Sequence, residues 1–290
     1  MKWRSYLVIL GLAVALPTPS LAADRILSIG IFPGTGTAEM LRADFRPLAA
    51  PFADELAKAL GRKAQLTMYR SLKSINRSMA KGRKDVYFAP PTVAVSAFNK
   101  GYSPIARVED FLKVALLRRK GATVTTVALT EKQSVPDVLA RFVIKQNGEN
   151  VKYMNVKTQE DVILAMKRNY AQAGGLGGKK AKVLLESGDY EVWYPLPASP
   201  GFTLVASDKM SESEKSRLEE AISAIDPRAV AKMQKAFVSK LGQFVADKDA
   251  EFKTLQQAMA GSWLSRRQQG HAVILSWRVV CFRPAKPAIR

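Results

Sequence analysis

The residues of this chain best suited to chemistry are small and hydroxylated, and they stand between expected strands and helices. The densest group lies in FPGTGTAEM and consists of Gly34, Thr35, Gly36 and Thr37. Backbone N–H groups in such a turn, with hydroxyls beside them, can bind an anion. The turn lacks the third glycine of a dinucleotide fingerprint and the Gly-Lys-Ser/Thr of a nucleotide phosphate loop. It therefore indicates either a small-anion site or an ordinary glycine turn.

Two further hydroxyls stand where helices are expected to begin. Thr92 follows Pro90 and Pro91, and Ser134 comes two residues before Pro136. Hydroxyl residues and prolines both favour the first positions of a helix, where free N–H groups attract anions. Each hydroxyl is therefore either a ligand contact or only a cap for its own helix.

The stretch GGLGGKK, residues 174–180, also resembles a phosphate-binding loop. No serine or threonine follows its lysines, and no clear strand precedes it, as such a loop requires. We interpret this stretch as a mobile linker.

Scarcity of histidine and cysteine argues against most catalytic and metal chemistry. The only histidine is His271 and the only cysteine is Cys281, and neither has a partner nearby in the sequence. Triads and metal sites require several convergent groups. We therefore expect no catalytic residue, no metal site, no cofactor and no disulfide framework, and we predict that the protein is not an enzyme.

The first residues have the pattern of a secretory signal peptide, predicted at 1–23. Two basic residues precede an apolar core at 7–16, and Ser20 with Ala22 gives the small-x-small pattern of a cleavage site. The core is too short to span a membrane, and no cysteine is available there for lipid attachment. These features predict an exported protein of the periplasm.

The net charge of +20 favours anionic partners. The leader contributes two of these charges and residues 261–290 contribute six, which leaves +12 on residues 23–260. Nucleic acid is not expected, because the chain is exported and has no aromatic-basic motif. Small anions, acidic surfaces and anionic lipid remain as partner classes.

Hydrophobic patterning predicts that strands and helices alternate in the first third of the chain. The predicted strands are 26–32, 65–69 and 85–89. The predicted helices are 48–60, with Pro47 in its first turn and Gly61 as its stop, 72–82, and 90–101. This alternation is typical of a parallel sheet, whose ligands bind at the carboxyl ends of the strands.

A second unit follows, and the chain then returns to the first. The second unit is predicted from strands 111–118, 123–129, 151–156 and 190–194 and helices near 134–148 and 158–168. Strand 202–206 and helices 211–225 and 229–244 are assigned to the first unit again. Two crossings leave hinges near 108–121 and 194–203, an arrangement that suits a clamshell closing on a ligand. The predicted divisions are lobe I at 24–108, lobe II at 109–197 and the return segment at 198–260.

The last residues, 261–290, form an atypical tail that is basic and apolar, with no acidic residue. We interpret it as poorly ordered. An added strand, a contact with a membrane surface and a non-native extension of the reading frame are the alternatives.

Over residues 24–260 the order and spacing of several segments resemble the type 2 periplasmic binding proteins. Within that group they resemble the phosphate, phosphite and phosphonate receptors of ABC transporters. The segments are IGIFP, FRPLAAPFADELAKALGRKAQL, INRSMAKGRKDVYFAPPTVAVSAFNKGYSPIARV and PLPASPGFTLVASDKMSESEKSRLEEAISAIDP. The resemblance implies an α/β two-lobed clamshell, each lobe a mixed sheet flanked by helices. It also implies a monomer that captures a small oxyanion and delivers it to an inner-membrane ABC permease.

The resemblance implies a set of ligand-binding positions. They are Gly34, Thr35, Gly36, Thr37, Tyr69, Pro91, Thr92, Ser134, Thr158 and Gln159, with Pro90 beside them. The chain departs from the family pattern at four places. Family members often have Gly-Pro-x-Ser-Tyr at 89–93, a serine-rich loop at 131–134, Ser-His near 157–158 and an acidic residue at Gln172. An aminoalkylphosphonate is therefore not expected. The ligand is expected to be another phosphate-like or phosphonate-like oxyanion, with an uncharacterised ligand as the alternative.

Two other functions stay open on the sequence. The same clamshell could be a sensory module that docks on a sensor kinase or chemoreceptor, with or without a ligand. An enzyme on this fold is the second alternative, and the absence of an activated nucleophile argues against it.

Overall fold

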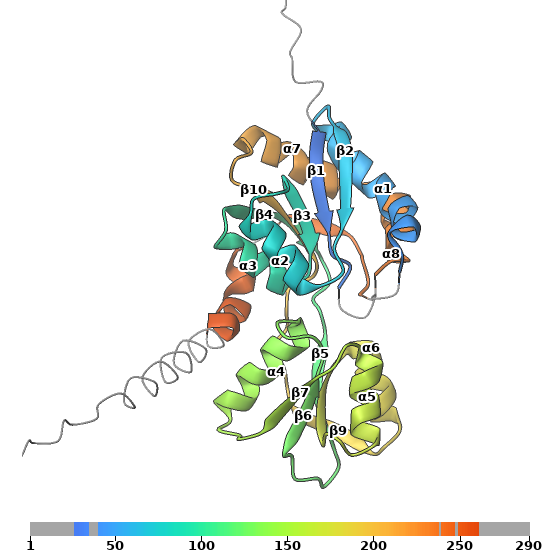
Figure 1. Ribbon diagram of the computed structural model, residues 1–290, viewed down its shortest axis with the longest axis vertical. Helices are drawn as coiled ribbons and strands as arrows, with labels where there is room; N and C mark the ends of the chain where they lie inside the picture. Colours follow the sequence, from blue (N-terminus) through green and yellow to red (C-terminus); the bar gives the residue numbers. More distant parts are fainter. Residues whose placement is uncertain (1–25, 35–39, 238, 247–248, 261–290) are drawn as a thin grey trace, which may run out of the picture.

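The computed structural model describes residues 26–34, 40–237, 239–246 and 249–260. These residues form two α/β lobes, each built on one mixed sheet with helices on both faces, as expected (Figure 1). The predicted signal peptide, the residues Thr35, Gly36 and Thr37, and the tail 261–290 lie outside the described residues. Within the described ranges, no helix combines the length and the apolar character that a membrane span requires.

Lobe I is built on a six-stranded sheet with the order β11-β4-β10-β3-β1-β2. The strands are β1 (Ile26–Ile31), β2 (Lys63–Met68), β3 (Val86–Ala89), β4 (Tyr102–Val108), β10 (Thr203–Ser207) and β11 (Phe244–Ala246). β1 pairs in parallel with β2 and β3, whereas β10 runs antiparallel to β3 and β4. The returning chain therefore supplies β10 and β11 to the first sheet.

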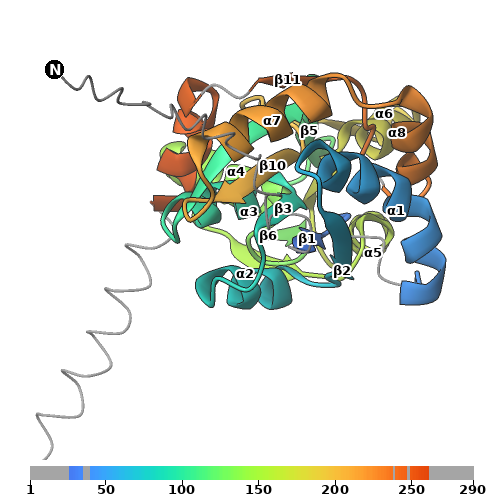
Figure 2. The same ribbon diagram turned by 90° about the horizontal axis from the view of Figure 1, so that it is seen from above.

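Helices cover both faces of this sheet (Figure 2). α1 (Arg42–Ala59), α7 (Glu212–Ser223) and α8 (Pro227–Gln234) pack on one face, and α2 (Leu72–Ala80) and α3 (Pro91–Phe98) pack on the other. A 3-10 turn, η2 (Asp249–Phe252), and the helical residues 253–260 follow, and Phe252 packs edge-on against Phe98.

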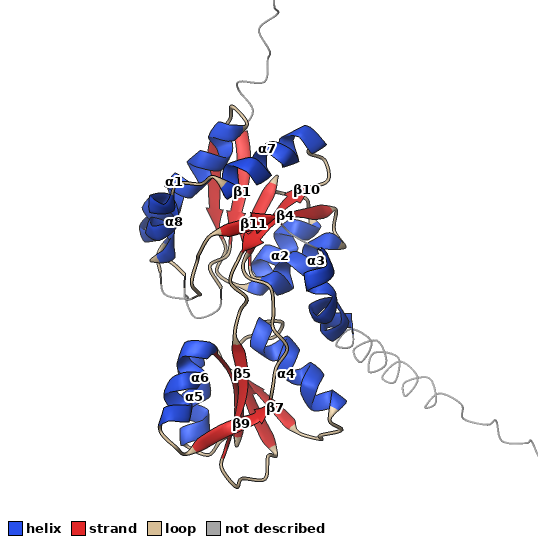
Figure 3. Ribbon diagram, turned by 180° about the vertical axis from the view of Figure 1, so that it is seen from behind, coloured by secondary structure: helices blue, strands red, loops and turns tan. Residues whose placement is uncertain are grey.

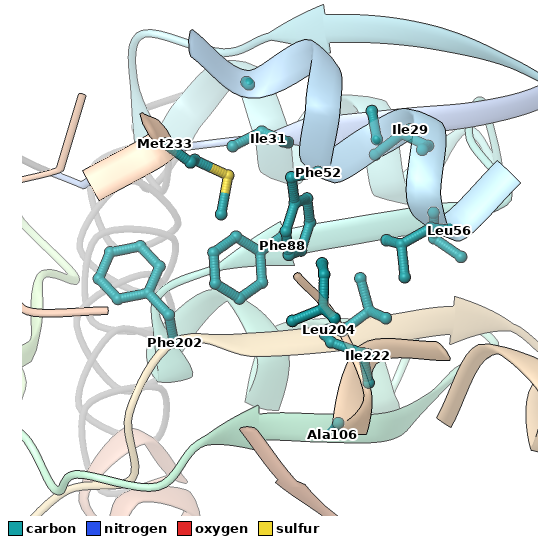
Figure 4. Close-up of a cluster of buried hydrophobic side chains, with 14 of the residues drawn as sticks. Ile29, Ile31, Phe52, Leu56, Phe88, Ala106, Phe202, Leu204, Ile222 and Met233 are labelled. Atoms are coloured by element: carbon teal, nitrogen blue, oxygen red, sulfur yellow. The ribbon is translucent and has the colours of Figure 1, made fainter. Parts of the chain in front are cut away.

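The core of lobe I is centred on Phe88 of β3 (Figure 4). Its ring centroid lies 5.3 Å from that of Phe52 and 5.7 Å from that of Phe202. Each fully buried large apolar side chain contributes about 1.5–3 kcal/mol to folding. Because Phe202 also lines the space between the lobes, this core fixes one wall of the candidate site.

Lobe II is built on a five-stranded sheet with the order β7-β6-β8-β5-β9. Its strands are β5 (Val114–Arg119), β6 (Thr126–Leu129), β7 (Lys152–Asn155), β8 (Ala173–Gly177) and β9 (Tyr190–Tyr194). β6 is parallel to β7 and β8, and β5 is antiparallel to β8 and β9. α4 (Val135–Gln146) covers one face, and α5 (Gln159–Lys167) and α6 (Gly178–Glu186) cover the other (Figure 3).

The predicted mobile linker at 174–180 is wrong, because its glycines form most of the central strand β8. A β-carbon on Gly174 would lie 2.5 Å from Met166 Sδ, and one on Gly175 would lie 2.8 Å from Leu129 Cδ2. Both distances are too short for a real side chain. The glycines therefore allow neighbouring side chains to pack directly on the strand.

Two helix predictions are also corrected. α1 begins at Arg42, so Pro47 and Pro51 lie inside it rather than in its first turn, and burial of its Phe45 face outweighs the lost hydrogen bonds. The predicted helix 229–244 ends at Gln234, whose side chain accepts from the Leu241 N–H and donates to two loop carbonyls.

Strand β4 was not predicted, because Pro104 interrupts its pattern. Opposite Pro104, between Leu204 and Val205 of β10, the register shifts. A proline has no N–H to donate, and such an irregularity lets the strand continue past it.

Two segments that join the lobes run side by side (Figure 3). Leu112 and Ser199 form an antiparallel bridge between them. At Gly201 a β-carbon would lie 2.7 Å from the Val108 carbonyl oxygen and 2.8 Å from that of Asp110. The hinge therefore requires glycine at this position.

Candidate functional site

A cavity of about 100 Å³ lies between the lobes, lined by residues of both lobes and of the hinge. A single water requires roughly 10–15 Å³ on the same measure, so the cavity has room for several waters or one small anion. Much of its wall is apolar, formed by Phe32, Leu72, Leu112, Val114, Val135 and Phe202.

The structure brings four of the predicted site residues together at this cavity. They are Gly34, Thr92, Ser134 and Gln159. Thr92, Ser134 and Gln159 lie at the starts of three helices in two lobes, and Gly34 lies in the loop after β1. The fold therefore brings residues that are far apart in the sequence to one cavity. Gly34 has φ +102°, a conformation that favours glycine.

Thr92 lies in the first turn of α3 and is 2% exposed. Its hydroxyl is buried and has no hydrogen-bond partner among the described residues, and the residue lines the cavity. A buried polar group without a partner costs about 1–3 kcal/mol. A ligand atom that hydrogen-bonds this hydroxyl would recover that energy.

Ser134 faces the same cavity from the N-cap of α4 in the other lobe. Its hydroxyl accepts from the Asp137 N–H and shares a hydrogen bond of 2.8 Å with the Thr130 hydroxyl. When Thr130 is the donor in that pair, the Ser134 proton is available to an anion. α4 lies below α2 and α3 in Figure 1, so Thr92 and Ser134 line the cavity from different lobes.

Gln159 is held in one orientation by Gly177. The Gly177 N–H donates to Gln159 Oε1 at 2.8 Å, which leaves the amide Nε2 as the donor end of the side chain. A β-carbon on Gly177 would lie 3.1 Å from the same Oε1, so glycine keeps this contact open.

Lys113 is a cavity residue that the predicted site did not include. It lies in the hinge just before β5, and its carbonyl accepts from the Gly178 N–H at 2.8 Å. Among the described lining residues it carries the one formal charge. Its place in the predicted hinge 108–121 was the signal that could have identified it.

Three other predicted residues are placed away from the cavity. The Tyr69 hydroxyl bonds Ser78, which in turn bonds Tyr87 at 2.7 Å inside lobe I. Burial raises the pKa of Tyr87, so the phenol of that residue stays protonated. Thr158 closes a capping box with Asp161, and Pro91 is a buried residue of the first turn of α3.

The arrangement provides hydroxyl, amide and ammonium donors to an anion. In the described part of the chain no group of histidine, cysteine and carboxylate side chains is placed to hold a metal ion. The described lining also holds no base beside a nucleophile.

Comparisons with known proteins bear on the family and the fold of the chain. A sequence model for the family described as "ABC transporter, phosphonate, periplasmic substrate-binding protein" matches residues 38–287. No curated protein matches the sequence.

Solved structures share the fold at low identity. XAC2383 from Xanthomonas citri, in a structure bound to ATP, has a TM-score of 0.67 at 16% identity, covering 83% of this chain and 98% of its own. PhnD1 from Prochlorococcus marinus, in complex with methylphosphonate, has a TM-score of 0.61 at 14% identity, covering 83% and 98%. PA3383 from Pseudomonas aeruginosa, a binding protein component of an ABC phosphonate transporter, has a TM-score of 0.57 at 14% identity, covering 81% and 85%.

Proposed function

Because the chain belongs to the family of periplasmic substrate-binding proteins of phosphonate ABC transporters, we propose that it captures a small oxyanion between its lobes. The lobes close on the ligand, and the closed receptor delivers it to an inner-membrane ABC permease. The protein acts as a monomer and catalyses no reaction.

The observation that carries this proposal is the buried Thr92 hydroxyl. It has no partner among the described residues, and Thr92 lies in the first turn of a helix and lines a cavity of ligand size. Helix N-termini favour negative charge by about 0.3–1 kcal/mol, and more where water is excluded. An oxyanion is the ligand that uses both features.

The remaining contacts come from the other side of the cavity. Ser134 and Gln159 donate from lobe II, and Lys113 supplies a positive charge from the hinge. A ligand that contacts both lobes stabilises their closed arrangement, since only that arrangement supplies every contact.

A thermal-shift screen tests the proposal. The purified protein is heated with phosphate, sulfate, methylphosphonate or methanesulfonate, and binding is confirmed by calorimetry. A ligand at a hundred times its Kd stabilises the folded state by about 2.7 kcal/mol, so at least one of these anions is expected to raise Tm. Absence of any shift, with no heat of binding, contradicts the proposal.

A further inference from the structure

The two faces of the lobe I sheet differ in their charge. Residues 72–108, which form α2, β3, α3 and β4, contain one carboxylate, Asp85, and it accepts from the N–H and the hydroxyl of Ser28 at 2.8 and 2.6 Å. On the opposite face, α1 and α7 carry acidic residues among their basic ones. α2 lies on the far side of the sheet from α7 in Figure 2, so positive charge is concentrated on the α2 face.

A row of basic residues runs along α2 on this face. Lys73, Arg77 and Lys81 follow one another at intervals of four residues, so their side chains lie on one side of the helix over about 12 Å. Arg70 precedes the helix and Arg83 follows it. We call these five residues the basic stripe. All five are exposed, and none of them forms an ion pair with a described carboxylate.

The less exposed arginines of lobe I, by contrast, are compensated within the chain. Arg62 pairs with Glu214, and Arg107 pairs with Glu251 of η2 on the α2 face. The basic stripe has no such partner among the described residues, and like charges four residues apart destabilise a helix. An anionic partner outside the chain would remove this repulsion.

The composition of the basic stripe indicates the kind of partner. The large apolar side chains that are exposed in the described part of the chain lie on other segments, such as Leu164 of α5 and Val183 of α6. Specific protein interfaces have an apolar centre and are depleted in lysine. An anionic bilayer requires only positive charge, because each lysine or arginine near its surface adds to the attraction. The basic stripe therefore fits a bilayer better than a protein surface.

The last described residues add no negative charge to this face. Residues 253–260 contain no carboxylate, and Leu255 and Met259 belong to the same apolar cluster as Ile75 and Met79 of α2. Residues 261–290, which follow directly, contain six basic residues and no acidic one. The segment joined to this face therefore adds positive charge to the chain and no negative charge.

From this charge pattern we propose that the basic stripe binds the anionic phospholipid surface of a membrane. Leu72, the first residue of α2, lines the cavity between the lobes, so the stripe begins beside the candidate site. Binding through the stripe holds that site close to a bilayer, where a permease is located. The proposal goes beyond the proposed function, because the stripe needs no ligand in the cavity.

Vesicle binding tests the proposal on the chain without residues 1–23, the predicted signal peptide, and without added ligand. At low salt the protein is expected to sediment with vesicles of phosphatidylglycerol and phosphatidylcholine in equal parts, and not with vesicles of phosphatidylcholine alone. Salt at about 1 M, where the screening length is about 3 Å, is expected to release it. Binding that is independent of lipid charge overturns the proposal. Failure to bind the anionic vesicles also overturns it, and is the result expected if the partner is an acidic protein.

Two pairs of substitutions separate the basic stripe from the net charge of the protein. Lys73→Gln combined with Lys81→Gln is expected to weaken binding to the anionic vesicles about twentyfold, since each charge near the surface contributes about fivefold. Lys58→Gln combined with Lys232→Gln removes two exposed lysines from α1 and α8 on the opposite face, and is expected to leave binding nearly unchanged. Residues 261–290 are kept in every protein, so the difference reports the stripe. Equal losses in the two pairs overturn the proposal.

Lysine acetylation in the unaltered protein gives the same comparison without any variant that must fold. Anionic vesicles are expected to protect Lys73 and Lys81 from acetic anhydride, as measured by mass spectrometry, and to leave Lys58 and Lys232 as reactive as before. Equal protection of all four lysines, or protection of none, overturns the proposal. Either failure leaves anion binding in the thermal-shift screen unaffected, so the two proposals can fail separately.

Discussion

Thr92, in the first turn of α3, and Ser134, the N-cap of α4, line one cavity from different lobes. Ser134 is already held by Thr130, whereas the Thr92 hydroxyl has no partner among the described residues. The Ser134 hydroxyl therefore already has partners within the protein, whereas the Thr92 hydroxyl is available to hydrogen-bond a ligand. This asymmetry leads to the first prediction.

Thr92→Val removes the hydroxyl and keeps the shape. Because a buried hydroxyl without a partner is unfavourable, the free energy of unfolding without ligand is expected to stay constant or to rise by about 1 kcal/mol. Affinity for the anion is expected to fall about tenfold or more, since a hydrogen bond to a charged group contributes about 1.5–3 kcal/mol. Urea unfolding and calorimetry measure the two effects. Thr92→Ser retains the hydroxyl and is the control, and equal affinity in all three proteins would show that the hydroxyl does not contact the ligand.

Lys113→Gln removes the positive charge from the cavity. The Lys113 side chain is exposed, so its attraction to an anion is screened by water, and affinity is expected to fall only about two- to fivefold, in line with exposed charge pairs. The dependence of affinity on salt should weaken as well. Lys120→Gln, in the exposed turn after β5, removes the same charge away from the cavity. Calorimetry at two salt concentrations compares them, and similar losses in both variants would contradict a local role for Lys113.

Tyr69→Phe tests the placement of a residue that the sequence assigned to the site. The Tyr69 hydroxyl is bonded to Ser78 inside lobe I, so its loss is expected to lower the free energy of unfolding by about 1 kcal/mol. Ligand affinity should not change. A normal Tm combined with weaker binding would show that Tyr69 contacts the ligand.

Gly201→Ala tests the close approach of the two hinge segments. The new β-carbon would lie within 3 Å of the carbonyl oxygens of Val108 and Asp110, and the clash is expected to lower stability by about 1–3 kcal/mol. Gly242→Ala is the matched control, because its β-carbon would be 3.6 Å from Asp110 Oδ2, an ordinary contact. Urea unfolding of both variants gives the comparison, and equal stabilities would argue against a tight hinge.

The sequence predicted well those elements whose apolar pattern is regular. β1, α2 and α5 lie close to their predicted ranges because each has one buried face and clear end signals. β8 was missed because Gly174 and Gly175 carry no apolar side chain, although their backbone is central to the sheet. The reason for those glycines is the packing of Met166 and Leu129, which are distant in sequence.

The site was predictable in part for a similar reason. Thr92 and Ser134 begin helices after strands, a local pattern that the sequence displays directly. Tyr69 also follows a strand, but its hydroxyl turns to Ser78 in the core, a contact that no local pattern specifies. Lys113 reaches the cavity only because the hinge passes between the lobes.

The most direct test of the central claim is a crystal structure of the protein grown with a bound oxyanion from the screen. We predict an anion oxygen at about 2.6–2.9 Å from Thr92 Oγ1, with Ser134 and Gln159 on the other side of the ligand. An anion bound elsewhere, with the Thr92 hydroxyl out of contact with it, would contradict the account.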